Sequence, residues 1–494
     1  MRSWGYWRRV ALSLICVLGF CFTSCGLPTT VSPPAAIAGR PDTFFEVVRV
    51  VESHYWDTDK VQPQALLKGA VDGMAPDLTR QQGHISYQGD QVVVSLSGQT
   101  KAVNLASIAT TYQFRDAFTD LHSFVLQHQR PTSEPINWEY RAIEGMIKRL
   151  DKNSSFMQPH EYREFVEDQK GSFSGIGIRI GLEEGEIVIL EPIEGTPAVK
   201  AGLKAGDRVV KIDGQPAKGL TLKEAVRRMR GPAGTRVSLG ILRKGLTEPE
   251  EISIIRARIE PKNVESRVLD GHIGYVKVEG FIETTFQQTE KALNRLTQQK
   301  VEGLILDLRN NPGGLLSQSV KVCGLFLEEG LLMVSTKGRV RNQNSSLSTN
   351  GGGQYRHYPL IVLINSGSAS GSEIIAGALQ DLHRATIIGI KSYGKASVQT
   401  IFPLQDGSGL RLTTAHYFTP NGRSIDHAGI VPDIEVRNEA KEDRQLTVSE
   451  AILKEALTRA SRRHPPNGRD APPIDSGMLI ELGRGMLVAP TVPP

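Results

Sequence analysis

One stretch, residues 359–400, constrains the fold of this 494-residue chain more than any other part. It begins with an apolar, β-branched run at 361–364, which has the length of a buried strand. The small residues of 365–372 follow, and they favour a tight turn with close backbone approach. Apolar residues then recur at helical spacing from Glu373 to Leu382. The pattern predicts a strand that turns sharply into a helix.

A serine in such a turn has two interpretations. The turn places a hydroxyl near a helix N-terminus, where backbone N–H groups can stabilise a developing oxyanion. Ser370 occupies that place and is a candidate nucleophile. Ser370 and Glu373 also match the capping box S-x-x-E, in which the serine only satisfies helix N–H groups. The turn by itself favours the capping box.

The second half of the stretch adds a candidate base. Residues 386–390 form another apolar strand, and Lys395 follows it. If 395–400 is extended, Lys395, Ser397 and Gln399 lie on one face, because side chains alternate along a strand. A lysine beside a turn serine can act as its general base when burial lowers the lysine pKa toward neutrality. The alternative is an ordinary exposed lysine on a strand.

Three motifs in order carry a resemblance to a known family. They are Asp-Leu-Arg-Asn-Asn-Pro-Gly-Gly at 307–314, Ser-Ala-Ser-Gly-Ser-Glu-Ile at 368–374 and Gly-Lys-Ala-Ser-Val-Gln at 394–399. Together they resemble the carboxyl-terminal processing (tail-specific) serine peptidases, and the resemblance extends from about 44 to 436. Two departures, Gly371 where alanine is usual and Ala396 where glycine is usual, remove no functional group.

The resemblance implies a role for each motif. It makes Ser370 the nucleophile, Lys395 the general base and Gln399 the residue that orients the lysine. The oxyanion hole would be the N–H of Gly371 and one N–H of Gly313-Gly314. The implied reaction needs no metal and no organic cofactor.

A second module begins near residue 171. The loop Gly175-Ile176-Gly177-Ile178 has N–H groups that can take a terminal carboxylate, although alone it is typical of a strand-end turn. With the glycine-rich motifs that follow, it resembles a bacterial PDZ domain that extends to about 258. Such modules bind the C-terminus of a protein by strand addition. Leu222, Val226 and Met229 line the side-chain pocket or belong to the core.

The predicted fold class is α+β with several domains. A helical region at 43–160, with a β-hairpin inserted near 84–109, precedes the PDZ-like β-rich domain at 171–258. By resemblance, residues 261–436 form an α/β peptidase core of the ClpP/crotonase-like kind. Two segments, 411–418 and 425–436, close this core as a hairpin-like pair. Residues 437–494 are predicted to be a peripheral or disordered tail with one helix at 447–460.

The N-terminus has the pattern of an export signal. Arg2, Arg8 and Arg9 precede an apolar run at 10–22, which is short for a membrane span. Cys25 is the candidate acylated residue of a lipoprotein box; ordinary cleavage within 1–25 and a retained anchor are the alternatives. A flexible linker at 26–42 follows. The expected location is the periplasm or a compartment like the thylakoid lumen, with membrane association through the N-terminus.

Two other functions fit parts of the sequence. A Ser-His-Asp hydrolase has His383, His416 and His427 available near Asp381 and Asp426, but Ser370 lacks the G-x-S-x-G elbow. An inactive scaffold that binds C-termini would be expected to have lost the serine or the lysine. The net charge of +5, without a Lys/Arg run, gives no reason to expect a nucleic-acid partner. The sequence therefore predicts an exported serine endopeptidase acting near protein C-termini, and it leaves the oligomeric state open, a homo-oligomer included.

Overall fold

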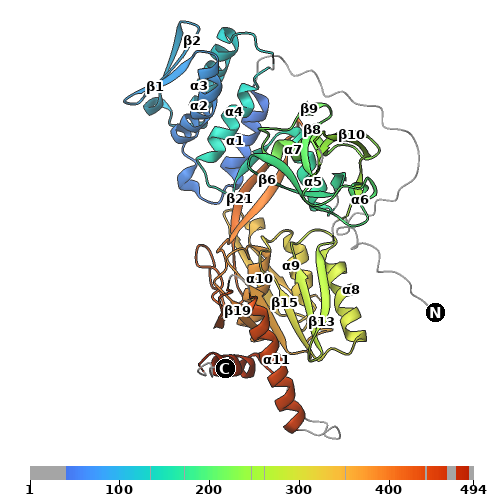
Figure 1. Cartoon of the computed structure of the whole chain (residues 1–494). Coiled ribbons are helices and arrows are strands. Elements are labelled where there is room, and N and C mark those ends of the chain that lie inside the picture. Colours follow the sequence, from blue (N-terminus) through green and yellow to red (C-terminus); the bar gives the residue numbers. More distant parts are fainter. Residues whose placement is uncertain are drawn as a thin grey trace, which may run out of the picture. The chain divides into compact units, whose positions relative to one another are not determined.

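The structure is a computed structural model that describes residues 41–133, 135–171, 173–245, 247–260, 262–350, 352–439, 442–463 and 474–488. From Pro41 onward the chain forms one compact unit (Figure 1). The predicted signal segment, Cys25 and most of the predicted linker lie outside the described residues. Within the described ranges, the helices all fall short of the length or the apolar character that a membrane span needs.

The N-terminal region is helical, as predicted, and surrounds its own core. Its helices are α1 (Asp42–His54), α2 (Pro63–Arg80), α3 (Thr111–His128) and α4 (Trp138–Lys148), with short 3-10 turns η1 (Thr58–Lys60) and η2 (Leu105–Ser107). Phe44 stacks on Phe118 with ring centroids 3.7 Å apart, and both are fully buried. The insertion has one strand more than the predicted hairpin. It is an antiparallel sheet of β1 (His84–Gln88), β2 (Gln91–Leu96) and β3 (Gln99–Asn104).

The next region is β-rich. After β4 (Ser155–Met157) and α5 (Pro159–Gln169), β5 (Phe173–Gly175) pairs with β12 (Ala257–Ile259). Between them lies a sheet in the order β11-β10-β8-β7-β6. Its elements are β6 (Ile178–Glu183), β7 (Glu186–Pro192), α6 (Pro197–Lys200), β8 (Arg208–Ile212), β9 (Gln215–Pro216), α7 (Leu222–Met229), β10 (Arg236–Leu242) and β11 (Glu250–Ile255). Strand β6 is the last in this order, so one of its edges is unpaired within the sheet.

A mainly parallel sheet forms the core of the C-terminal half. The order is β13-β14-β15-β18-β19-β22, in which only β13 runs antiparallel to its neighbour. The elements are β13 (Val264–Leu269), β14 (Ile273–Val278), α8 (Thr285–Gln298), β15 (Gly303–Asp307), α9 (Leu316–Gly324), β18 (Leu360–Ile364), α10 (Gly371–Asp381), β19 (Thr386–Gly389) and β22 (Ile434–Glu435). Strands and helices therefore alternate from β14 to α9, as the predicted α/β core requires.

Alternation along the parallel strands buries both faces of this sheet. Leu304 and Val362 pack in one cluster with α8, α9 and α10, whereas Ile305 and Ile361 pack in another with Ile452 and neighbouring residues. The second cluster is built by α11 (Arg444–Arg463) and α12 (Ser476–Val488). The prediction of a peripheral tail is wrong for these two helices, because the sheet would expose an apolar face without them.

A second sheet runs in the order β17-β16-β21-β20, with β4 added beside β21. Its elements are β16 (Leu332–Gly338), the 3-10 turn η3 (Arg341–Gln343), β17 (Ser345–Ser348), β20 (Ser397–Pro403) and β21 (Gly409–Phe418). The predicted pairing of 411–418 with 425–436 is wrong. Strand β21 pairs with β20, β16 and β4, while Ile434–Glu435 adds in parallel to β19.

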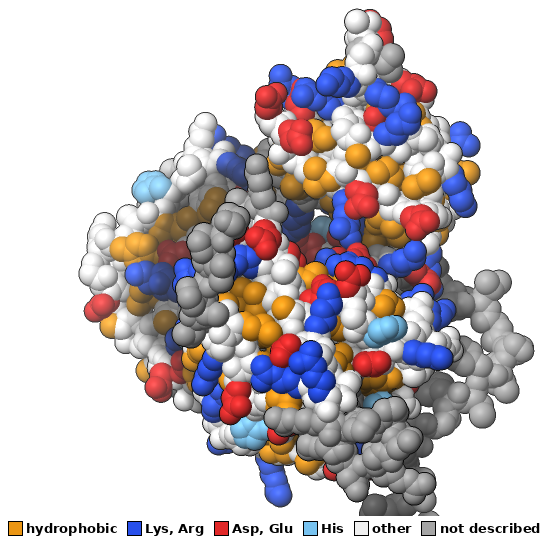
Figure 2. Space-filling model, turned by 60° about the horizontal axis from the view of Figure 1, so that its bottom comes forward, with side chains coloured by type: hydrophobic (Ala, Val, Ile, Leu, Met, Phe, Trp, Pro, Cys, Tyr) orange, Lys and Arg blue, Asp and Glu red, His pale blue; other side chains and the backbone are white. Residues whose placement is uncertain are grey.

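The visible surface carries charges of both signs. On the face shown in Figure 2, Lys and Arg side chains are interspersed with Asp and Glu side chains among the described residues. That face therefore lacks the continuous basic region that attracts a polyanion.

Candidate active site

Ser370 lies where the sequence places it, in the turn between β18 and α10. It has a φ of +54°, a conformation that a residue with a Cβ rarely adopts. Its two neighbouring serines are held by structural bonds: the hydroxyl of Ser368 donates to the Leu308 carbonyl at 2.8 Å and that of Ser372 to the Asn311 carbonyl at 2.9 Å. Both are fully buried. The capping-box interpretation is confirmed in part, because the Ser370 N–H donates to the Glu373 carboxylate at 2.8 Å, whereas Ser370 Oγ makes no side-chain cap bond in return.

Glu373 joins the serine turn to the lysine segment. Its carboxylate accepts the backbone N–H of Ser370 at 2.8 Å, of Gly394 at 2.7 Å and of Lys395 at 2.9 Å, together with the Ser392 hydroxyl at 2.5 Å. The side chain is fully buried. A buried carboxylate is stable only with such hydrogen bonds. The Glu373 carboxylate therefore fixes the backbone of both candidate catalytic residues from one point.

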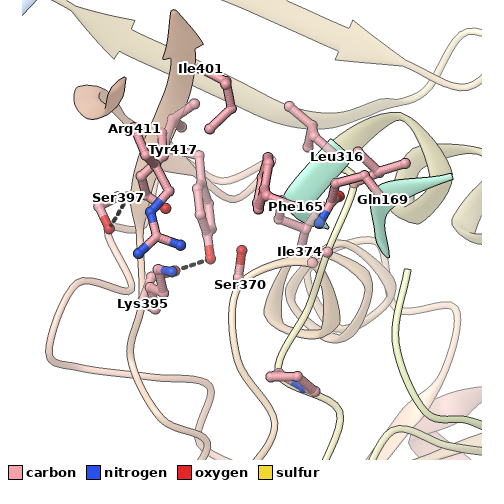
Figure 3. Close-up of a pocket in the computed structure, with 16 residues that line it drawn as sticks. Phe165, Gln169, Leu316, Ser370, Ile374, Lys395, Ser397, Ile401, Arg411 and Tyr417 are labelled. Atoms are coloured by element: carbon pink, nitrogen blue, oxygen red, sulfur yellow. Dashed lines mark hydrogen bonds between the residues drawn. The ribbon is translucent and has the colours of Figure 1, made fainter. Parts of the chain in front are cut away.

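A cavity of about 300 Å³ opens beside Ser370 (Figure 3). Its polar lining consists of Gln169, Ser370, Lys395, Ser397, Gln399, Arg411 and Tyr417. Its apolar lining includes Phe165, Leu315, Leu316, Ile374, Val398 and Ile401. Helix α5, the second sheet and α10 thus bring together residues that are far apart in the sequence.

Lys395 has the surroundings that a lysine base requires. Burial lowers the pKa of Lys395 below its ordinary value of 10.5, and the positive charge of Arg411 lowers it further. Asp151 and Glu373 act in the opposite direction through their negative charges. Among the described residues, none forms a hydrogen bond or an ion pair with Lys395 Nζ. The side chain is half-buried and lines a cavity, so the interpretation as an exposed strand lysine does not fit.

Gln399 lines the cavity but bonds to a different partner. Its Nε2 donates to Ser397 Oγ at 2.8 Å, and Asn153 Nδ2 donates to the same oxygen at 3.1 Å. Within the described chain it makes no hydrogen bond to Lys395. Strict alternation from 395 to 400 also fails, because the register with β21 shifts between Val398 and Gln399 and both residues line the cavity.

The predicted oxyanion donors differ in whether their N–H groups are already hydrogen-bonded. The N–H of Gly313 donates to Asn311 Oδ1 at 2.9 Å, so it is occupied. The N–H groups of Gly314 and Gly371 have no acceptor among the described residues, and both glycines line the cavity with Ser370. Gly314 has a φ of +142°, and a Cβ there would overlap the Phe281 carbonyl. Gly314 and Gly371 are therefore the two available donors.

Several cavity residues were not identified from the sequence, and two of them, Tyr417 and Arg411, interact with Lys395. Tyr417 is buried, its hydroxyl donates to the Lys395 carbonyl, and it also interacts with Ser370. Burial raises the pKa of Tyr417 well above its ordinary value of 10.0, so the phenol keeps its proton. Arg411 is the other. Both belong to β21. The apolar pattern predicted this strand, but it does not show that the strand lies beside the segment of Lys395.

The histidines of the alternative hydrolase lie elsewhere. His416 Nδ1 is 3.9 Å and His427 Nε2 is 3.6 Å from one oxygen of Asp426. These three residues line a second cavity, of about 360 Å³, whose lining includes Lys395 but not Ser370. The carbonyl of His383 accepts the Ser476 hydroxyl, and Asp381 pairs with Arg423. None of these groups lines the cavity of Ser370.

The predicted carboxylate loop precedes the edge strand β6. Gly177 has a φ of +82°, and a Cβ there would meet the Thr196 side chain at 2.4–2.5 Å, so only glycine fits. Ile176 is buried, and its carbonyl accepts the Ala198 N–H at 2.8 Å. Of the proposed pocket residues, Met229 belongs to the core of this region, while Leu222 is only partly buried against it.

Comparisons with known proteins find matches to both the C-terminal core and the β-rich region. The profile of peptidase family S41 matches residues 272–436, and that of a PDZ domain matches residues 188–243. A carboxy-terminal-processing protease of Bartonella bacilliformis is 48% identical over 299 residues, which cover 60% of this chain and 68% of that protein. A carboxyl-terminal-processing protease of Synechocystis sp. is 40% identical over 301 residues, or 60% of this chain and 70% of that protein.

A solved structure, the photosystem II D1 C-terminal processing protease, aligns with 80% of this chain and 93% of its own at 27% identity and a TM-score of 0.45. The family matches confirm the predicted fold class of a helical segment, a PDZ domain and an α/β peptidase core. The S41 match contains the turn of Ser370, the segment of Lys395 and the glycines of the 313–314 loop.

Proposed function

The chain belongs to peptidase family S41, a family of serine peptidases, and carries a PDZ domain; from this we propose an exported endopeptidase that cuts proteins near their C-termini with a Ser370/Lys395 dyad. One observation carries the dyad. Ser370 shares a cavity with a half-buried lysine that has no hydrogen-bond partner for its amine among the described residues and whose pKa is lowered by burial. Such an amine is available to accept a proton.

The reaction proceeds in two halves. Ser370 Oγ attacks the scissile carbonyl carbon while Lys395 Nζ takes the hydroxyl proton, and the protonated amine then gives that proton to the leaving nitrogen. In the second half, water loses a proton to Lys395 Nζ as its oxygen attacks the acyl carbon. Lys395 then returns the proton to Ser370 Oγ as the bond between Oγ and the acyl carbon breaks, and the new carboxylic acid leaves and loses its proton to solvent.

The negative charge of each tetrahedral intermediate needs donors. The N–H groups of Gly371 and Gly314 supply them, because both line the cavity and neither donates to another described residue. Such a donor contributes roughly 2.7–4 kcal/mol to the stability of the transition state. Neither step needs a metal or an organic cofactor.

The PDZ domain selects substrates through their C-termini. A substrate tail adds as a strand at β6, the edge of the sheet, and its terminal carboxylate meets N–H groups of the 175–178 loop. The relatives named above are called carboxy-terminal-processing proteases, in keeping with this assignment.

Cleavage of an unfolded protein with a free, apolar C-terminus tests the dyad. Ser370→Ala and Lys395→Ala are expected to abolish cleavage while remaining folded by circular dichroism and thermal unfolding. Matched controls are Ser366→Ala and Lys391→Ala, because both side chains are exposed and lie in the same two segments. If Lys395→Ala keeps wild-type activity, the base is another group and the dyad is wrong. If the wild type binds C-terminal peptides but cuts nothing, the chain is a scaffold.

Recognition of the C-terminus is tested with a pair of substrates that differ at one group. A peptide with a free C-terminal carboxylate is compared with the same peptide carrying a C-terminal amide. The amide is expected to raise KM about tenfold or more with little change in kcat, because the carboxylate contacts the PDZ domain and not the reacting atoms. Equal KM values would remove C-terminal capture from the proposal.

Export and anchoring rest on the sequence of residues 1–25. If Cys25 is acylated, the mature chain fractionates with membranes and incorporates labelled fatty acid, and Cys25→Ser releases it. A mature chain that begins after residue 25 and carries no lipid would instead indicate ordinary signal cleavage.

A further inference from the structure

Two cationic side chains line the cavity of Ser370. One is Lys395, and the other is Arg411, the third residue of β21. Its neighbours Leu410 and Leu412 are fully buried in the N-terminal cluster. Because side chains alternate along a strand, Arg411 is directed away from that cluster. Figure 3 shows its guanidinium group on the same side of the cavity as Lys395.

The Arg411 guanidinium is not held as a structural arginine is held. Its Nε is buried without a hydrogen-bond partner, and no carboxylate among the described residues pairs with the group. By contrast, Arg309 pairs with Asp307 and Asp443, and Arg384 donates to three backbone carbonyls. A buried, unpaired polar atom is unfavourable. An unpaired cation beside a reacting site is therefore a candidate for a role in the reaction.

The structure points to such a role. We propose that Arg411 is a positioning residue of the peptidase, which holds Lys395 in its neutral form by placing a fixed positive charge in the same cavity. The inference rests on the function proposed above, since it assumes that Lys395 is the base.

The direction of the effect follows from the two side chains. A guanidinium group keeps its proton throughout the pH range in which proteins are folded, whereas a lysine amine can lose its proton when buried. Two positive charges in one partly buried cavity repel each other, so Lys395 is the group that gives up its charge. In agreement, Arg411 is the second largest cause of the lowered Lys395 pKa, after burial.

The acids nearest Lys395 do not cancel this repulsion by pairing with its amine. The Glu373 carboxylate is occupied by three backbone N–H groups and a hydroxyl. Asp151, in the turn after α4, accepts the N–H groups of Asn153 and Ser154 and the hydroxyls of Ser154 and Thr413. The other charged or titratable groups on the two cavities of Lys395 are Tyr417, Lys60, Lys152, Tyr393, His416, Asp426 and His427.

The same repulsion assists the second proton transfer. Once Lys395 Nζ has taken the proton of Ser370, two full positive charges face the cavity. Passing that proton to the leaving nitrogen removes one of them. Arg411 therefore favours both the neutral starting state and the departure of the amine, without contacting a reacting atom.

The pH dependence of kcat/KM tests this role. It is measured from about pH 6 to about pH 10 for the wild type, Arg411→Gln and Arg411→Lys. Arg411→Gln is expected to move the midpoint of the acid limb upward by about one pH unit, because a nearby charge shifts a pKa by that amount or more. Its activity then falls about tenfold well below the midpoint and recovers above it. Arg411→Lys keeps a positive charge and is expected to keep the wild-type midpoint.

Controls separate this from a general loss of charge or of folding. Lys391→Gln removes an exposed cation four residues from Lys395 and is expected to leave the midpoint unchanged. Arg411→Met keeps the aliphatic stem and supplies the same comparison if Arg411→Gln does not fold. A loss of activity by the same factor at every pH, or an unchanged profile, overturns the proposal. If Lys395→Ala is inactive in that case, the dyad stands and only the role of Arg411 fails.

Discussion

The backbone N–H of Lys395 donates a 2.9 Å hydrogen bond to the carboxylate of Glu373, the third residue of the helix that begins after Ser370. The same carboxylate oxygen accepts the N–H of Ser370 at 2.8 Å. Ser370 and Lys395 come from different elements, and Glu373 is the group that both segments contact. The distance between the two proposed catalytic residues therefore depends on one buried side chain.

Replacing Glu373 by Gln tests that dependence. Glutamine keeps the shape but turns one acceptor oxygen into a donor, which then faces groups that are themselves donors. We expect a loss of on the order of 3 kcal/mol in the free energy of unfolding, together with a fall in kcat. Urea unfolding and peptide cleavage measure the two effects. Glu329→Gln, at an exposed position, is the matched control; a Glu373→Gln variant as stable and active as this control would show that the carboxylate is dispensable.

The activity should rise with pH in a single step. Lys395 must be neutral to accept the Ser370 proton, and its pKa lies below 10.5. We expect kcat/KM to increase about tenfold per pH unit below the Lys395 pKa and to level off above it. Peptide cleavage across the neutral and alkaline range measures the step. A flat profile over the whole range would count against a lysine base.

The same pKa shift has a consequence for stability. Because Lys395 binds a proton more weakly in the folded than in the unfolded chain, its contribution to stability is most favourable above the unfolded pKa of about 10.5. It becomes less favourable as the pH falls from there toward the folded pKa. Comparing the pH dependence of unfolding for the wild type and Lys395→Met isolates this contribution, and identical slopes would contradict it.

The missing side chain of Gly371 leaves room for the hydroxyl of Ser319. A Cβ at position 371 would overlap the Ser319 hydroxyl and approach the Phe281 ring to 3.0 Å. We expect Gly371→Ala to lower the free energy of unfolding by roughly 1–3 kcal/mol and to reduce kcat by misplacing the oxyanion donor. The double variant Gly371→Ala/Ser319→Ala should recover part of both losses, since it removes the overlapping oxygen. A double-mutant cycle with no coupling between the two positions would refute this pairing.

Gly314 is expected to be essential for another reason. A side chain there would overlap the Phe281 carbonyl and displace the backbone of a residue that lines the cavity. We expect Gly314→Ala to reduce kcat roughly 100-fold or more, as removal of an oxyanion donor does. Gly330→Ala is the control, because it has a φ of +83° but no atom within 4 Å of the added Cβ. Equal effects of the two substitutions would indicate backbone strain alone.

The C-terminal helices should contribute to the stability of the peptidase core. Ile452 on α11 is fully buried against the sheet. We expect Ile452→Ala to lower the free energy of unfolding by roughly 2–5 kcal/mol. Arg462→Ala, on an exposed part of the same helix, should change it little. If both variants unfold at the wild-type denaturant concentration, α11 is a peripheral element after all.

The sequence by itself determined the parts whose signals are local. The apolar run at 361–364 and the small residues after it predicted the turn of Ser370, and the glycines of 175–177 predicted the loop before β6. Helical spacing predicted α10 within a few residues. These elements depend on neighbours in the chain, so periodicity and turn chemistry are enough to place them.

Tertiary structure alone decided what lies around Ser370. The hydrogen bond of Gly313 to Asn311 leaves Gly314 as the free donor, and the register shift at Val398–Gln399 turns both residues to the cavity. The position of Arg411 beside Lys395 depends on β21 pairing with β20. The sequence of a strand does not by itself specify which other strand it pairs with. The burial of α11 follows from a sheet that is apolar on both faces, which becomes evident only when its strands are assembled. Local patterns specify elements, whereas the pKa and the free hydrogen-bonding groups of a site depend on which elements meet there.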